Sequence, residues 1–233
     1  MALILNIETA TKVCSVSLAK DGQLMAFKEH NGDYSHAENL TRFIEDVLLQ
    51  AGVKLQIVDA IAVSMGPGSY TGLRIGVSAA KGLCYALDKP LIAISTLKHL
   101  AFSISNNLII TIDNDKLQFC PMLDARRMEV YCAIFDFSNN EIKPTAAEIM
   151  DENSFSGFLN EKISYFFGDG AAKCKELLSV HENMIFIDNV FPSAINMIAL
   201  SEQAYINKQF EDIAYFEPFY LKDFIAGKKK SLL

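Results

Sequence analysis

The sequence predicts an α/β protein built from two similar lobes, each with strands and helices in the order βββαβα. Three observations support this prediction. Both halves open with short strands joined by tight turns. An acidic residue, Glu8 or Asp124, ends the first strand of each half, and a glycine loop follows a later strand, at residues 66–68 and 168–170. Such an internal repeat constrains the architecture more than any single motif does.

The first lobe is assigned to residues 1–105, and its opening elements follow from hydrophobic alternation and turn residues. A helix is expected over residues 36–51, because Ser35 can cap its first turn and Gly52 can end it. The three strands that precede this helix form a predicted meander over residues 2–7, 13–18 and 23–27.

The remaining elements of the first lobe surround the glycine loop. A strand over residues 58–65 precedes the loop, and a helix that runs to about Leu87 follows it. Pro90 prevents this helix from continuing, so residues 91–94 form the last strand.

The second lobe, residues 106–233, repeats this plan. Its predicted elements are strands over residues 122–124, 130–135 and 141–145, a helix near 155–161, a strand over 163–167 and a helix through Leu178. Sites in α/β sheets form beyond the carboxyl ends of strands, so both acidic strand ends and both glycine loops are expected at one cleft. This layout is typical of the actin, Hsp70 and sugar-kinase (ASKHA) superfamily.

Composition and charge narrow the class of protein. With 51% hydrophobic residues, the chain can bury one large core or two modest ones. Its apolar runs are shorter than the roughly 18 residues of a membrane-spanning helix. Five scattered cysteines without a CxxC pair indicate a reducing, cytoplasmic location. A net charge of −7 opposes direct binding to a phosphate backbone, so a partner should hold any RNA.

The densest signal in the chain is the loop and helix start GPGSYTGLRIG. It lacks the GK pair of a Walker loop, and its glycine spacing is one residue too long for a dinucleotide fingerprint. A tight turn with Ser69 or Thr71 as helix cap also explains the glycines. The loop residues singled out are Gly66, Pro67, Gly68, Ser69, Tyr70 and Thr71.

The helix after the loop carries a second feature. Gly72, Gly76 and Ala80 recur every four residues beside a separate apolar face. Each glycine lowers helix stability, and such a small face usually lets another helix approach closely. The small face therefore either packs within the lobe or meets another chain.

These stretches carry a resemblance to a known family. MGPGSYTGLRIG, the opening LNIETAT, the segment LDARRMEVY and the near-terminal PFYLK together resemble the TsaB (YeaZ) family over most of the chain. The resemblance implies an actin-like fold without chemistry of its own. It implies a role beside the catalytic relative TsaD and the ATPase TsaE, in placing a threonylcarbamoyl group on the adenosine next to the anticodon of tRNAs that read codons beginning with A.

The same resemblance implies partners and a pairing surface. The chain would form a homodimer when alone, contact tRNA indirectly through the complex, and need no cofactor, while the complex uses ATP. The helices after the meander and after the glycine loop would pair with TsaD, so that Gly76→Glu would spare the fold and abolish the complex. The implied interface residues are Leu40, Phe43, Val47, Gly72, Arg74, Gly76, Ala79, Ala80 and Leu83.

A catalytic or metal-binding role is not predicted. TsaD-type relatives bind a metal through an HxxxH helix, whereas His36 is followed four residues later by Leu40, which leaves one ligand where two are needed. An ATP-dependent phosphotransferase remains an alternative, although it needs a base and a metal in the cleft. A peptidase is a further alternative that lacks a recognisable zinc motif or nucleophile pair.

The acidic strand ends leave two interpretations open. In nucleotide-binding members of the superfamily, acids at these positions help to place a metal-bound phosphate. Turn chemistry is the favoured interpretation, with Glu8 bonding to the amides through Ala10 and Thr11 and Asp124 acting likewise before Arg126. The alternative nucleotide cleft would comprise Glu8, Thr9, Asp124, Gly168, Asp169 and Gly170.

Two features near the C-terminus complete the predictions. The lysines at 228–230 either touch tRNA or form a solvated end of the chain. The nearby aromatic residues are expected to pack back onto the body instead of stacking on bases, and these are Tyr215, Phe216, Phe219 and Tyr220.

Overall fold

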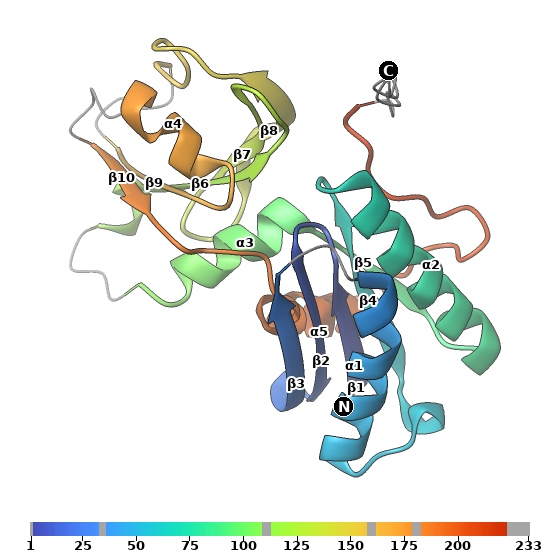
Figure 1. The fold of residues 1–233 in the computed structure, drawn as a ribbon. Coiled ribbons are helices and arrows are strands. Elements are labelled where there is room, and N and C mark those ends of the chain that lie inside the picture. Colours follow the sequence, from blue (N-terminus) through green and yellow to red (C-terminus); the bar gives the residue numbers. More distant parts are fainter. Residues whose placement is uncertain (1, 33–35, 109–112, 158–161, 179–182, 223–233) are drawn as a thin grey trace, which may run out of the picture.

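The computed structural model describes residues 2–32, 36–108, 113–157, 162–178 and 183–222. These residues form two lobes, each built on a five-stranded mixed sheet with helices against it (Figure 1). The actin-like, two-lobed ASKHA fold expected from the repeat is confirmed. None of the helices in the described ranges is long and apolar enough to cross a membrane.

The first sheet has the strand order β3-β2-β1-β4-β5. The first three strands are antiparallel neighbours, and β4 and β5 continue the sheet in parallel with β1. The predicted meander, both helices and both later strands are therefore confirmed. The elements of this lobe are β1 Leu3–Glu8, β2 Val13–Lys20, β3 Gln23–Asn31, α1 His36–Ala51, η1 Leu55–Ile57, β4 Ala60–Gly66, α2 Tyr70–Leu87 and β5 Leu91–Ser95.

The second sheet, β10-β9-β6-β7-β8, repeats the first in order and direction. Strand β6 takes the place of β1, and β9 takes the place of β4. The elements after β5 are α3 Thr96–Ser105, η2 Asn114–Lys116, β6 Leu117–Asp124, β7 Glu129–Phe135, β8 Glu141–Ile149, β9 Ile163–Phe167, α4 Ala171–Leu178, β10 Met184–Ile187, η3 Ala194–Met197 and α5 Ile198–Ile206.

One predicted helix is wrong where the structure describes it. Residues 155–157 form turns instead of a helix. Phe155 has a positive φ of 69°, and its ring is buried in the second core 5.6 Å from the ring of Phe166. Tertiary packing thus overrides the local pattern. Residues 158–161 of that prediction, and the predicted cap Ser35, lie outside the described residues.

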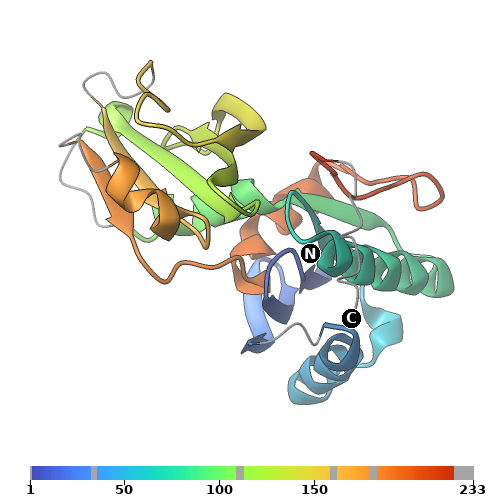
Figure 2. The same ribbon diagram turned by 45° about the horizontal axis from the view of Figure 1, so that its top comes forward.

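Two helices that the sequence analysis did not identify join the lobes. Leu97 and Leu100 of α3 pack into the core of the second sheet, with Phe119 and Phe167. Helix α5 comes from the other end of the chain and packs against the first sheet. Figures 1 and 2 show α3 between the lobes, and Figure 1 shows α5 behind the first sheet. A lobe boundary at residue 105 stays a prediction, because each of these helices covers the sheet of the other half.

The face of the first sheet toward α5 is partly polar. Ser15 and Ser17 of β2 are buried and hold the backbone of Ala194. Ser15 Oγ accepts from the amide of Ala194 at 2.9 Å, and Ser17 Oγ donates to its carbonyl at 2.9 Å. Both backbone polar groups of Ala194 are thereby satisfied in a buried place, which fixes where the C-terminal helices dock.

Candidate functional site

The glycine loop forms a tight connection between β4 and α2. Ser69 is the N-cap of α2, as predicted, because its Oγ accepts a hydrogen bond from the amide of Gly72 at 3.3 Å. Its own amide donates to the carbonyl of Ala10 at 2.6 Å. The loop therefore lies against the turn after β1.

The small face of α2 packs against that same turn. A Cβ atom on Gly72 would overlap the carbonyl oxygen of Thr9, and one on Gly76 would overlap the Thr9 hydroxyl. Thr9 Oγ1 donates to the carbonyl of Gly72 at 2.8 Å, and Ala80 is also buried. Of the two alternatives that the sequence left open, the small face is thus used within the lobe.

The predicted interface residues divide into two groups. Leu40, Val47, Gly72, Gly76 and Ala80 are buried within the lobe, so another chain cannot reach them without disrupting it. Arg74 is exposed, whereas Phe43, Ala79 and Leu83 are half-buried. Gly76→Glu would therefore disrupt the lobe itself, and the expectation that it spares the fold is wrong.

Glu8 lies at the centre of a buried polar cluster. The side chain is 0% exposed, and Oε1 accepts hydrogen bonds from the amide of Ala10 and from Ser64 Oγ, the latter at 2.9 Å. Oε2 lies 2.6 Å from His99 Nε2. Turn chemistry at Glu8 is confirmed by the bond to Ala10. Ser64 and His99 were not predicted as partners of Glu8, because they lie 56 and 91 residues away in the chain.

Asp124 occupies the equivalent strand end in the second lobe, and its side chain is 48% exposed. It accepts a hydrogen bond from the amide of Arg126 at 3.1 Å, as the turn interpretation predicts. It also forms an ion pair with Lys173 of α4. Its own amide donates to Asp169 Oδ1 at 3.0 Å, and burial raises the pKa of the Asp169 carboxyl.

The second glycine loop also packs inside its lobe. Gly168 has a φ of +105°, and a Cβ atom there would overlap the carbonyl of Met122. A Cβ atom on Gly170 would lie 2.8 Å from the carbonyl carbon of Leu123. These glycines let the loop approach β6 closely.

A cleft of about 660 Å³ lies between the two lobes. The structure brings both glycine-loop regions to it, through Ser69 and Asp169. Glu8 is buried beneath the turn and does not line the cleft, and neither do Thr9, Gly168 and Gly170. The lining residues are Ala10, Thr11, Gly68, Ser69, Tyr70, Thr71, Leu123, Asp124, Ala125, Arg126, Tyr131, Asp169 and Lys222.

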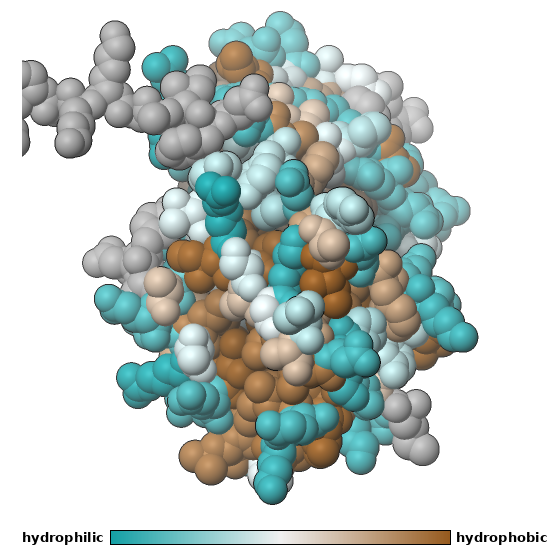
Figure 3. Space-filling model, turned by 90° about the vertical axis from the view of Figure 1, so that its right-hand side faces the viewer, coloured by the Kyte–Doolittle hydropathy of each residue, from teal (hydrophilic) through white to brown (hydrophobic). Residues whose placement is uncertain are grey.

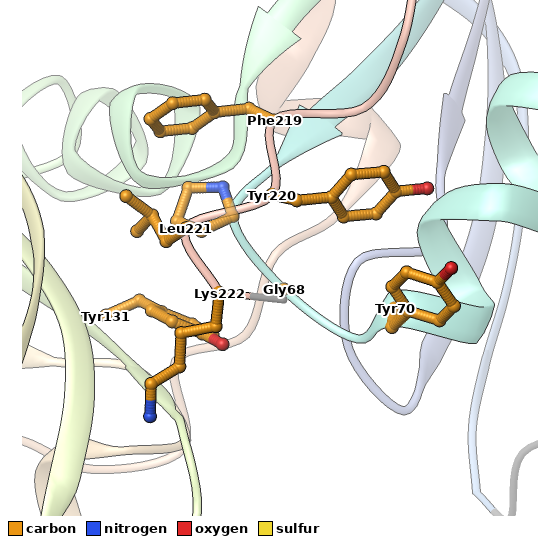
Figure 4. Close-up of a pocket in the computed structure, with 8 residues that line it drawn as sticks. Gly68, Tyr70, Tyr131, Phe219, Tyr220, Leu221 and Lys222 are labelled. Carbon is orange, nitrogen blue, oxygen red and sulfur yellow. The ribbon is translucent and has the colours of Figure 1, made fainter. Parts of the chain in front are cut away.

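The aromatic residues near the C-terminus pack back onto the first lobe, with one exception. Phe216 is buried in the first core. The amide of Phe219 donates to the carbonyl of Met65 at 2.7 Å, and the Tyr220 and Tyr70 rings lie 5.0 Å apart (Figure 4). Tyr215 is 84% exposed, so the prediction is wrong for this residue. The lysines at 228–230 lie outside the described residues.

Potential metal ligands and nucleophiles are either scattered or buried in the described ranges. His, Cys, Asp and Glu nowhere gather there into a group of three that could hold a metal ion. His36 is buried, and its Nε2 lies 2.7 Å from the carbonyl oxygen of Thr11. The five cysteines are buried, and burial raises the pKa of the Cys14 and Cys84 thiols to about 12.

Known proteins resemble this chain over nearly its whole length. The tRNA threonylcarbamoyladenosine biosynthesis protein TsaB of Escherichia coli K12 is 28% identical over 236 residues, which cover 97% of each chain. The structure of YeaZ from Pseudomonas aeruginosa is similar with a TM-score of 0.80 and 25% identity, over 95% of this chain and 100% of that one.

A more distant likeness concerns the fold alone. The polyphosphate/ATP-glucomannokinase of Arthrobacter sp. strain KM has a TM-score of 0.52 at 8% identity, over 89% of this chain and 100% of the kinase.

A family model described as TsaD: tRNA N6-adenosine threonylcarbamoyltransferase matches residues 32–229. The chain therefore belongs to the tRNA N6-adenosine threonylcarbamoyltransferase family, in its TsaB (YeaZ) branch.

Proposed function

We propose that this chain is a noncatalytic, cytoplasmic subunit in the biosynthesis of threonylcarbamoyladenosine, next to the anticodon of tRNAs that read codons beginning with A. It binds the catalytic relative TsaD in a complex that also includes the ATPase TsaE and consumes ATP. The tRNA is held through the complex, and the chain alone forms a homodimer. The names of its relatives support the pathway.

The observation that carries the partner role is an apolar row on α1 and α2. Ile75, Ala79 and Leu83 follow one another every four residues along α2, and Phe43 lies on α1, which contacts α2. All four are only half-buried on the first core. Figure 3, viewed from the right-hand side of Figure 1, shows apolar surface gathered over this lobe. Contiguous exposed apolar surface is typical of a protein interface.

Arg74 gives this row a polar end. It is exposed, its guanidinium lies 5.1 Å from the centroid of the Tyr70 ring, and it donates to the Tyr70 hydroxyl at 3.0 Å. Arginine and tyrosine are enriched in protein interfaces, where a positioned guanidinium can reach carbonyl or carboxylate groups of a partner. Four residues of the row and Arg74 thus define the proposed binding face.

The acidic residues at the two strand ends and in the second glycine loop support a role without chemistry. Glu8 is buried and has three partners within the chain, so it is not oriented toward a substrate or a metal. Asp124 and Asp169 are likewise bonded within the second lobe. A phosphotransferase would need a carboxylate in the cleft that is free to act as base or metal ligand. Among the described residues, no specific feature favours the phosphotransferase or the peptidase alternative.

Size-exclusion chromatography with light scattering tests this proposal on the chain, its TsaD counterpart and their mixture. The proposal predicts a mixed species that Ala79→Glu abolishes, because a carboxylate would be desolvated in the centre of the apolar row. Ala172→Glu, at an exposed position of α4, is the matched control and should leave the mixed species intact. A mixed species that persists with Ala79→Glu would contradict the assigned face, and the absence of any mixed species would contradict the partner role.

A further inference from the structure

The C-terminal segment follows the first lobe before it reaches the cleft. The amide of Glu211 donates to the carbonyl of Leu91 at the edge of the first sheet, at 2.9 Å. Phe216 is then buried in the first core, and its carbonyl accepts a hydrogen bond from Lys81 Nζ at 2.8 Å. The path of the segment up to this point is therefore fixed by the first lobe.

Residues 216–222, called here the C-terminal strap, next pass along the glycine loop. The amide of Phe219 bonds to Met65, and a Cβ atom on Gly66 would lie 2.9 Å from the carbonyl oxygen of Phe219. The Tyr220 ring then packs on Tyr70 at the start of α2. Strap and loop enclose a space of about 30 Å³, which Figure 4 shows in close-up.

The strap reaches the other lobe within two more residues. Lys222 forms an ion pair with Glu129, which begins β7 of the second sheet. Its side chain also lines the cleft together with Tyr131 of β7, and Figure 4 shows these two side chains next to each other. The side chains of Lys222 and Glu129 are 43% and 18% exposed. One short segment thus contacts both walls of the cleft.

We propose that the C-terminal strap sets the opening of the cleft between the lobes, with the Lys222–Glu129 ion pair as its latch. Rigid lobes joined by a few connections rotate about those connections, and a contact that bridges them limits the rotation. An ion pair between partly exposed groups is weak, so this latch opens and closes at equilibrium. The inference rests on the strap contacts and does not depend on the proposed function.

Single-molecule energy transfer between dyes on the two lobes tests the latch in the full chain. Gln50→Cys on α1 and Ala172→Cys on α4 are exposed labelling sites, and the native thiols are buried. We expect Lys222→Ala to raise the open population roughly two- to fivefold, in line with the strength of an exposed ion pair. Glu129→Gln should do the same.

The double variant separates a latch from two unrelated effects. If the two side chains act through one ion pair, Lys222→Ala combined with Glu129→Gln opens the cleft no more than either change alone. Lys175→Ala is the control, because it breaks an exposed ion pair with Asp188 inside the second lobe, and it should leave the distances unchanged. An unchanged open population in Lys222→Ala, additive effects in the double variant, or equal opening by the control would each overturn the proposal.

Discussion

The turns after β1 and after β6 occupy the same place in the two lobes and differ in what surrounds them. Glu8 is fully buried and joins three elements, β4, α3 and its own turn. Asp124 is 48% exposed and bonds to Lys173 and to the amide of Arg126, which both lie in the second lobe. The first turn also receives the small face of α2. The repeat is therefore used asymmetrically: the first strand end supports α2 and α3, and the second borders the cleft.

This difference bears on function because α2 carries the proposed binding face. Thr9 fixes one side of α2, and Ile75, Ala79 and Leu83 are displayed on another. A face on a helix that is held in place binds a partner with less loss of conformational entropy. In the proposed complex, the first turn would contribute to binding through its packing against α2, without contacting the partner.

The largest expected difference in the free energy of unfolding is between the Glu8→Ala and Asp124→Ala variants. Removal of Glu8 leaves His99, Ser64 and the amide of Ala10 buried without their partner, which should lower the free energy of unfolding by about 3–5 kcal/mol. Asp124→Ala removes exposed contacts and should cost about 1 kcal/mol or less. Urea unfolding of both variants measures the contrast, and equal losses would show that the two strand ends are alike.

A second contrast lies within α2. Gly76→Ala places a methyl group on the Thr9 hydroxyl and should lower the free energy of unfolding by about 1–3 kcal/mol. Gly82→Ala meets nothing within 4 Å and should raise it by about 0.5–1 kcal/mol, because alanine favours the helix. Thermal unfolding separates the two variants. A Gly76→Ala protein as stable as Gly82→Ala would mean that the small face is not packed on the turn.

The smallest effect concerns the second lobe and pH. Burial raises the pKa of the folded-state Asp169 carboxyl above its usual value near 3.8. The folded state therefore binds this proton more tightly than the unfolded state does. The associated stability is present below about pH 4 and is lost as pH rises through the folded-state pKa. Asp169→Asn keeps an oxygen that can accept from the amide of Asp124. Its free energy of unfolding should therefore be equal to or higher than that of the parent at pH 7, and below pH 4 it should not be higher.

Helix caps and turns could be predicted from neighbouring residues in the sequence, whereas contacts between residues far apart in the chain could not. Ser69 as a cap and Gly52 as a helix end follow from neighbouring residues, and the structure has both. The His99 contact to Glu8 spans 91 residues. Ser95, the N-cap of α3, is a local start signal for that helix, but it does not indicate which distant residue His99 meets. Helix α5 has apolar residues on all sides, so it lacks the stripe that reveals a surface helix.

The small face shows why the sequence alone could not separate packing residues from those of the proposed binding face. Glycines at four-residue spacing permit close approach by any neighbour, and the pattern does not say which. The structure assigns that neighbour to Thr9. Ile75 was not predicted as part of a binding face, because it belongs to neither the small face nor the apolar face identified on this helix. It lies four residues before Ala79 and is half-buried like it. The burial of each side chain in the structure separates the residues that pack within the lobe from the half-buried residues that a partner could contact.

The central claim is that the first lobe serves binding and that the cleft carries no chemistry of its own. Reconstituted threonylcarbamoylation of tRNA with the TsaD and TsaE counterparts tests it most directly, using Ala79→Glu for the binding face and Asp124→Ala for the cleft. The account predicts that modification is lost with Ala79→Glu and stays at the parent level with Asp124→Ala. Loss with Asp124→Ala, together with normal modification by Ala79→Glu, would contradict it.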